Sequence, residues 1–152
     1  MRSFLLFLHL SAVIIWLGGM FFAHFFLRPA AAEQLPPAQR LPLLAAILGS
    51  FFKTVTFAIV ILLVSGFARM GMTGFAQAPL HWHLMSAIGL LMTTIFALIY
   101  LFHYPQLKSA VAAQAWEPAG AAMNRIRRLV WVNLCLGALT VAVATLGPLF
   151  AA

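Results

Sequence analysis

The sequence predicts an all-α integral membrane protein, a four-helix bundle that forms a single domain over residues 1–152. Three observations support this fold class. The chain is 64% hydrophobic and only 7% charged, whereas about a quarter of the residues of a soluble domain are charged. Its mean hydropathy is +1.05. Four apolar segments alternate with more polar stretches, and each segment is long enough to cross the hydrocarbon core of a bilayer, which is about 30 Å thick.

The first predicted span, residues 4–27, contains no Asp, Glu, Lys or Arg, yet it carries His9 and His24. A helix of this length is roughly 36 Å long. A titratable side chain is costly inside a membrane, so a histidine in this span predicts a partner or ligand there. The apolar run is too long for the core of a secretory signal, and we expect it to be retained as a span.

The other three spans follow in order. A Pro-rich segment, residues 29–42, is expected to be a linker before the second span at residues 52–68. A connection with several glycines, residues 69–79, is expected to form an ordered loop before the third span at residues 80–102. The fourth span, residues 129–146, follows a stretch interrupted by two prolines and ends before a Gly-Pro pair.

The basic residues predict the orientation of the bundle. One side holds only Arg2 and Arg69, and the positive-inside rule makes it the extracytoplasmic side, with both termini. The net charge of +7 then reflects orientation and contact with lipid headgroups, not a nucleic-acid surface. We expect a multi-pass protein of the bacterial inner (plasma) membrane. The cytoplasmic side holds seven basic residues, Arg28, Arg40, Lys53, Lys108, Arg125, Arg127 and Arg128.

Two histidines predict a haem site. Spans one and three run in the same direction, which places His9 and His83 at a similar depth near the extracytoplasmic face. Two imidazoles that face each other across a bundle are suited to axial ligation of haem b. Trp16 lies nearly on the same helical face as His9 and is expected to lie against the porphyrin. A bis-imidazole iron has no open position, so this hypothesis favours electron transfer, with a quinone or a redox protein as partner.

His24 and His103 approach a common depth near the cytoplasmic face and suggest a second haem. At 100° per residue, however, His83 and His103 fall on opposite sides of span three, so the two haem sites conflict unless that helix bends. The alternative for His24 and His103 is an interfacial position at a span end. Haem propionates would be met by Arg2 and Arg69 on one side, and by Arg28, Arg40, Arg125 or Arg128 on the other.

A second group of residues favours copper. Met70 and Met72 are followed nine residues later by His81 and His83, all on the predicted extracytoplasmic side. Thioether sulfur and imidazole are suitable ligands for Cu(I). Methionine is also a common filler of irregular gaps in apolar cores. Copper binding by Met70, Met72, His81 and His83 is the alternative to haem binding.

A family resemblance bears on both hypotheses. The pattern H-L-x-A-x-x-x-W-x-G-G at residues 9–19 resembles the copper-resistance D (CopD) membrane family. The resemblance covers nearly the whole chain and implies copper uptake across the inner membrane. Longer members of that family have more spans, and this chain looks like their C-terminal four-helix module. Further matching segments are Leu27-Arg28-Pro29, Phe51-Phe52, Ser65-Gly66, His83-Leu84-Met85 and Arg125-Ile126-Arg127 with Asn133.

The pattern of the first span is also similar to HemJ, a protoporphyrinogen oxidase that binds haem through histidines of its first and third spans. That resemblance implies His9 and His83 as haem ligands. HemJ has a lysine near the start of span three that is absent here, so its oxidase activity is not implied. A quinone-linked or protoporphyrinogen-oxidase-like oxidoreductase and a cofactor-free assembly subunit both remain open. The faces with small residues also allow a homodimer.

Overall fold

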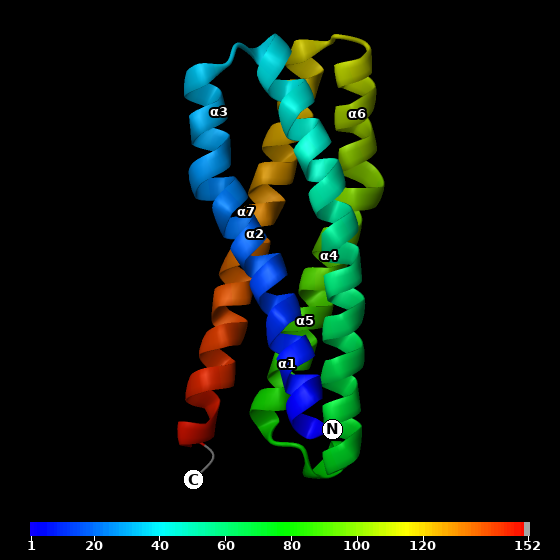
Figure 1. Ribbon diagram of the computed structural model, residues 1–152, viewed down its shortest axis with the longest axis vertical. Helices are drawn as coiled ribbons and strands as arrows, with labels where there is room; N and C mark the ends of the chain where they lie inside the picture. The colour runs from blue at the N-terminus through cyan, green and yellow to red at the C-terminus, as the bar shows by residue number, and fades with distance from the viewer. Residues whose placement is uncertain (151–152) are drawn as a thin grey trace.

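The computed structural model describes residues 1–150, and these residues form four long helices packed side by side (Figure 1). No strand occurs among the described residues. The predicted fold class, an all-α membrane bundle of four helices, is confirmed. Each long helix is apolar enough to cross a membrane, and their bounds are Arg2–Gln34, Pro37–Thr73, Leu80–Ala112 and Trp116–Leu146.

The first long helix changes its winding twice. It consists of α1 (Arg2–Val13), η1 (Ile14–Gly18), α2 (Gly19–Phe22), η2 (Ala23–Leu27) and α3 (Arg28–Gln34). The segments η1 and η2 are π-helical, so one residue more than usual is fitted into each of these turns. The helix therefore continues past residue 27, where the first span was predicted to end.

The linker expected over residues 29–42 is mostly helical, so that prediction was wrong. Only Leu35 and Pro36 are extended, between α3 and α4 (Pro37–Thr73). Pro37 occupies the first turn of α4, where a backbone N–H has no partner within the helix and its loss costs little. The helix that contains the predicted second span thus begins fifteen residues before residue 52.

The α4 helix also extends into the loop that was expected over residues 69–79. It ends at Thr73, because Gly74 adopts a φ of 89°, a left-handed conformation that favours glycine. Met70 and Met72 consequently lie on a helix. The remaining connection to the next helix holds one short 3-10 turn, η3 (Phe75–Gln77).

The third long helix, like the first, contains a π-helical turn followed by a proline. The second half of the chain contains α5 (Leu80–Leu98), η4 (Ile99–His103), α6 (Tyr104–Ala112), α7 (Trp116–Leu146) and η5 (Gly147–Phe150). The π-helical turn η4 precedes a proline at residue 105, just as η2 precedes a proline at residue 29. A π-helical turn disturbs the regular hydrogen-bond ladder, so the next proline removes less than it would from an ideal helix.

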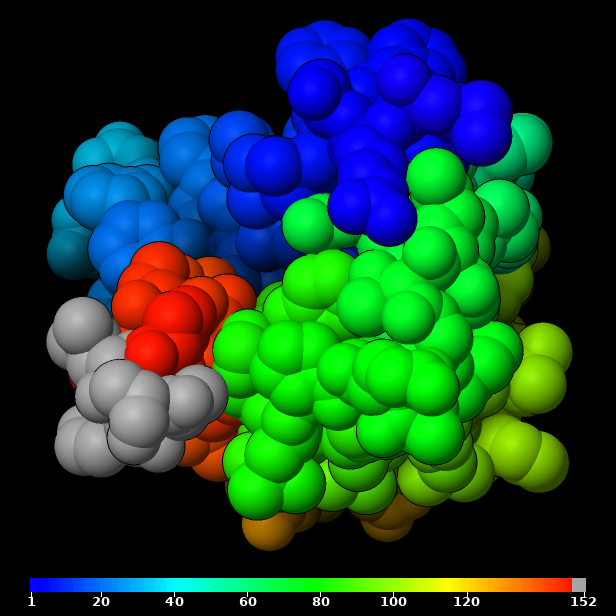
Figure 2. Space-filling model, turned by 90° about the horizontal axis from the view of Figure 1, so that it is seen from below, coloured from blue at the N-terminus to red at the C-terminus, as the bar shows by residue number. Residues whose placement is uncertain are grey.

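The two ends of the bundle differ in what they carry. The N-terminus, the end of α7 and the α4–α5 connection lie at one end, here named the terminal end (Figures 1 and 2). The α3–α4 and α6–α7 connections lie at the other end, here named the basic end because Arg28, Arg40 and Lys108 are close to it. The assignment of the terminal end to the extracytoplasmic side stays a prediction from the charge distribution.

The core that joins the helices is strongly aromatic. The Trp16 and Phe96 rings meet edge to face with their centroids 6.2 Å apart, and Phe52 makes the same kind of contact with Phe96 at 5.7 Å. Trp16 and Phe52 are at most 2% exposed. This packing holds the first long helix against α4 and α5 near the middle of the bundle.

Candidate functional site

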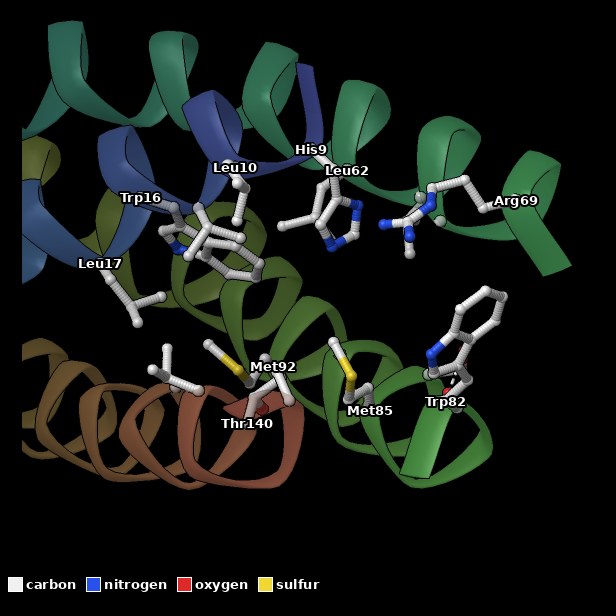
Figure 3. A pocket seen from close by; sticks show the side chains of 18 of the residues that line it. His9, Leu10, Trp16, Leu17, Leu62, Arg69, Trp82, Met85, Met92 and Thr140 are labelled. Atoms are coloured by element: carbon white, nitrogen blue, oxygen red, sulfur yellow. Dashed lines mark hydrogen bonds between the residues drawn. The ribbon is translucent and has the colours of Figure 1, made fainter. Parts of the chain in front are cut away.

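A cavity of about 210 Å³ lies between α1, α4, α5 and α7, on the terminal side of this aromatic core (Figure 3). Its lining is mostly apolar, with a few polar side chains, among them His9, Arg69 and Ser86. An apolar space with a small number of polar groups facing it is the usual form of a ligand site within a helical bundle. We therefore treat it as the candidate functional site.

His9 is held in this cavity by a residue of the neighbouring helix. Its Nδ1 atom lies 3.0 Å from the Oγ of Ser65, a residue that is 1% exposed. The Ser65 hydroxyl also lies 3.2 Å from the backbone carbonyl of Leu62, which can only accept, so we assign the hydroxyl proton to that carbonyl and the Nδ1–H tautomer to His9. In the neutral ring the lone pair is then on Nε2, and this nitrogen can bind a metal ion.

Gly66 provides the space that the imidazole occupies. A Cβ at this position would lie 3.3 Å from Cε1 of His9 and 3.6 Å from Nδ1. Small residues let membrane helices approach closely, and here the glycine lets a ring from α1 pack against the backbone of α4. Ser65 and Gly66 thus fix the position of His9 together, one by a hydrogen bond and one by lacking a side chain.

Three methionines line the same cavity. Met70 comes from α4, and Met85 and Met92 come from α5. Met70 and Met92 are nearly buried, and the Met70 sulfur lies 3.2 Å from the Oγ of Ser86. Figure 3 shows Met85 and Met92 on the side of the cavity opposite His9. One imidazole and three thioethers from three helices therefore face a common space.

The cavity is bordered toward the α4–α5 connection by a cation–π contact. The guanidinium carbon of Arg69 lies 5.2 Å from the ring centroid of Trp82, and both residues line the cavity. Figure 3 shows the two side chains facing each other from α4 and α5. Arg2 lies outside this lining and donates a long hydrogen bond of 3.4 Å to the backbone carbonyl of Met72. Of the two arginines expected to meet a propionate, only Arg69 lines the cavity.

The structure does not bring His9 and His83 together. His83 is not among the residues that line the cavity, and its Nε2 donates a hydrogen bond of 3.1 Å to the backbone carbonyl of Phe75 in the α4–α5 connection. Trp16, in contrast, lines the cavity together with His9. The first and third spans are parallel as expected, but the face of α5 toward the cavity carries methionines in place of a second imidazole.

The four residues expected to bind copper are also dispersed. Met70 lines the cavity, whereas Met72 is 38% exposed and lies outside the lining. Two residues apart on a helix, these side chains point in directions about 160° apart. His81 lies against the end of α7, because a Cβ at Gly147 would meet the His81 side chain. The helix that replaces the expected loop thus separates the predicted ligands.

His24 and His103 likewise do not share a cavity. His24 stacks on Trp131 with ring centroids 5.1 Å apart and lines a second cavity together with Arg28. His103 is absent from that lining, and its Nδ1 is buried without a hydrogen-bond partner. Arg125 lies outside the lining and donates a hydrogen bond of 3.5 Å to Gln106. Both histidines belong to π-helical turns, which change the helical face that a residue occupies.

The cavity near His9 fits a metal ion better than a haem. Pockets for ligands of drug size have volumes of about 300–1,000 Å³, larger than this cavity of about 210 Å³. Only one imidazole lines it, so bis-histidine ligation does not fit the arrangement. Among the described residues, no group of three or more His, Cys, Asp or Glu could hold a metal ion. A metal in this cavity would depend on thioether ligands, which favour Cu(I).

The sequence patterns did not indicate a contact of Ser65 and Gly66 with His9, and the predicted copper ligands did not include Met85 and Met92. Ser65 itself was the feature of the sequence that could have indicated this contact. A polar side chain within an apolar span needs a partner, and the adjacent glycine marks a place of close approach. Which helix supplies that partner depends on how the helices are rotated, and hydropathy alone does not determine the rotation.

One comparison with known proteins found a match. A family model described as "Copper resistance protein D" matches residues 45–146. The match covers most of α4 and all of α5 to α7, so it includes Ser65, Met70, Met85 and Met92 and begins after His9. No curated protein and no solved structure matched the chain.

Proposed function

The chain belongs to the copper resistance protein D family, and we propose that it binds copper as cargo inside its membrane bundle. One observation carries this proposal. The imidazole of His9, with its Nε2 left free by the hydrogen bond from Nδ1 to Ser65, shares a cavity with three thioethers. The family supports copper over haem, and the donor set supports the same choice independently.

The ligand chemistry favours the cuprous ion. Thioethers and imidazole are soft or borderline neutral donors that suit Cu(I), whereas a divalent hard ion needs the carboxylates that this cavity lacks. We assign His9, Met70 and Met85 as the ligands. Met92 follows Met85 by two turns on the same face of α5 and offers the next thioether toward the middle of the bundle. Neutral ligands hold the ion without trapping it as thiolates would.

The direction of transfer follows from the predicted orientation. With the terminal end outside the cytoplasm, copper enters past Arg69 and Trp82 and reaches His9 first. The proposed location is the bacterial inner membrane.

The orientation is tested by cysteine labelling in a Cys135→Ala background. A cysteine introduced at Ser3 should react with a membrane-impermeant maleimide in intact cells, whereas one at Ala113 should react only after permeabilisation. The reverse labelling would contradict this orientation.

Copper binding is tested by titrating detergent-purified protein with Cu(I) against a chromophoric chelator without oxygen. We expect one tightly bound Cu(I) per chain and an affinity at least about tenfold lower in His9→Ala. The matched control is His81→Ala, which removes an imidazole outside the cavity and should bind as the wild type does. Equal affinity of wild type and His9→Ala would contradict the proposal. So would a Soret band that disappears in both His9→Ala and His83→Ala, because it would support haem.

A further inference from the structure

A second cavity, of about 150 Å³, lies toward the basic end between the first long helix, α4 and α7. It shares no lining residue with the cavity around His9. Its interior is apolar, with Phe51 and Ile126 among the residues that line it. Three basic side chains complete the lining, His24 and Arg28 from one side and Arg127 from the facing helix α7.

The two arginines of this cavity lack a compensating negative charge. Arg28 experiences the positive charges of Arg127 and Arg40, and His24 those of Arg28 and Arg127. Within the described part of the chain, neither Arg28 nor Arg127 forms an ion pair with either of the two acidic residues, Glu33 and Glu117. Two partly buried guanidinium groups that repel each other next to an apolar space favour a ligand with one anionic and one apolar part.

The aromatic residues around the cavity are consistent with the depth of lipid headgroups. His24 stacks on Trp131, and Phe25 meets the same indole edge to face at 5.9 Å. Trp131 and Phe25 are both exposed on the outside of the bundle. Tryptophan side chains gather where the hydrocarbon core of the membrane meets the headgroups. Arg28 and Arg127 would therefore lie at the level of phosphate groups.

We propose that this cavity binds one anionic phospholipid, with its phosphate between Arg28 and Arg127 and part of an acyl chain in the apolar interior. Guanidinium groups bind phosphate oxygens through paired, charge-assisted hydrogen bonds. Basic pockets between membrane helices are suited to anionic headgroups. A zwitterionic lipid would bring its own cation toward the two arginines. Free phosphate would leave the apolar interior unfilled.

The proposal is tested by native mass spectrometry of the protein released from nanodiscs with equal amounts of phosphatidylglycerol and phosphatidylcholine. The wild type should retain one phosphatidylglycerol. Retention should fall about fivefold for each guanidinium lost in Arg28→Gln and Arg127→Gln, and further in the double variant. The matched control is Arg128→Gln, because Arg128 is exposed, adjacent in sequence and absent from the lining. Gel filtration of each variant serves as the control for folding.

A second variant tests the apolar part of the site with the charges intact. Ala23 lines the cavity, and Ala23→Phe should fill it and reduce phosphatidylglycerol retention while leaving both arginines in place. Excess inorganic phosphate should not displace the lipid. The proposal is overturned if the double variant retains lipid as the wild type does, if Arg128→Gln loses as much, or if inorganic phosphate alone displaces it.

Discussion

The Nδ1 atom of His9 lies 3.0 Å from the hydroxyl oxygen of Ser65, and this contact joins the first long helix to α4 across 56 positions of sequence. Because the hydroxyl proton is used on the carbonyl of Leu62, the contact also determines which ring nitrogen of His9 is free. A single hydrogen bond thereby links helix packing to the availability of a metal ligand.

Ser65→Ala should leave the bundle folded but weaken Cu(I) binding by about 10- to 100-fold. The reason is that loss of an outer-shell partner frees the imidazole to rotate and to change tautomer. The measurement is the chelator competition described above. Ser50→Ala is the control, because Ser50 is exposed on the same helix. Unchanged affinity in Ser65→Ala would show that the Ser65 contact does not orient a ligand.

Met70→Leu and Met72→Leu should differ sharply in copper binding. Leucine replaces methionine with little change of volume, so the comparison removes sulfur without opening a cavity. Met70→Leu should lower the Cu(I) affinity about tenfold, because Met70 lines the cavity. Met72 is outside the lining, and Met72→Leu should bind as the wild type does. Equal losses in the two variants would favour a site at the α4–α5 connection instead.

Gly66→Ala should weaken copper binding although alanine favours helix formation. The added Cβ would lie 3.3 Å from Cε1 of His9, so the ring must move by a few tenths of an ångström. We expect roughly a tenfold loss of affinity, because a binding geometry tolerates only about 0.5 Å of displacement. Gly89→Ala also adds a methyl group to the cavity lining but meets nothing within 4 Å. If both variants lost the same affinity, the argument from His9 packing would fail.

Asn133→Ala should destabilise the packing of α7 against α5. The buried Asn133 amide donates a hydrogen bond of 3.1 Å to the backbone carbonyl of Met92. Hydrogen bonds between membrane helices contribute about 0.6 to 2 kcal/mol, and a similar loss is expected in the free energy of unfolding in mixed detergent. Asn124→Ala, on the exposed face of the same helix, should have no effect. A loss of equal size in both variants would contradict a specific role for the Met92 contact.

The number of spans and the fold class were predictable, because long apolar segments separated by charges have few other solutions in a membrane. The helix ends were not, since prolines were read as breaks. Pro29 and Pro105 follow π-helical turns, and Pro37 and Pro118 occupy first turns, so each is accommodated within a helix. Composition alone does not reveal which proline has such a position.

The site was only partly predictable for a related reason. His9 was expected to have a partner inside the bundle, because a histidine in an apolar span needs one, and it lines the cavity and contacts Ser65. Its pairing with His83 rested on depth, whereas the contact with Ser65 depends on the rotation of two helices about their axes. The face that His103 occupies was calculated at 100° per residue, and the π-helical turn η4 changes that angle.

The central claim is that His9 and the methionine thioethers of one cavity bind the same copper ion. X-ray absorption at the copper K edge, on protein loaded with one equivalent of Cu(I), tests it most directly. The account predicts scattering from sulfur together with one imidazole, and loss of the imidazole contribution in His9→Ala while sulfur scattering persists. A spectrum with nitrogen and oxygen ligands alone, or an imidazole contribution that is unchanged in His9→Ala, would contradict it.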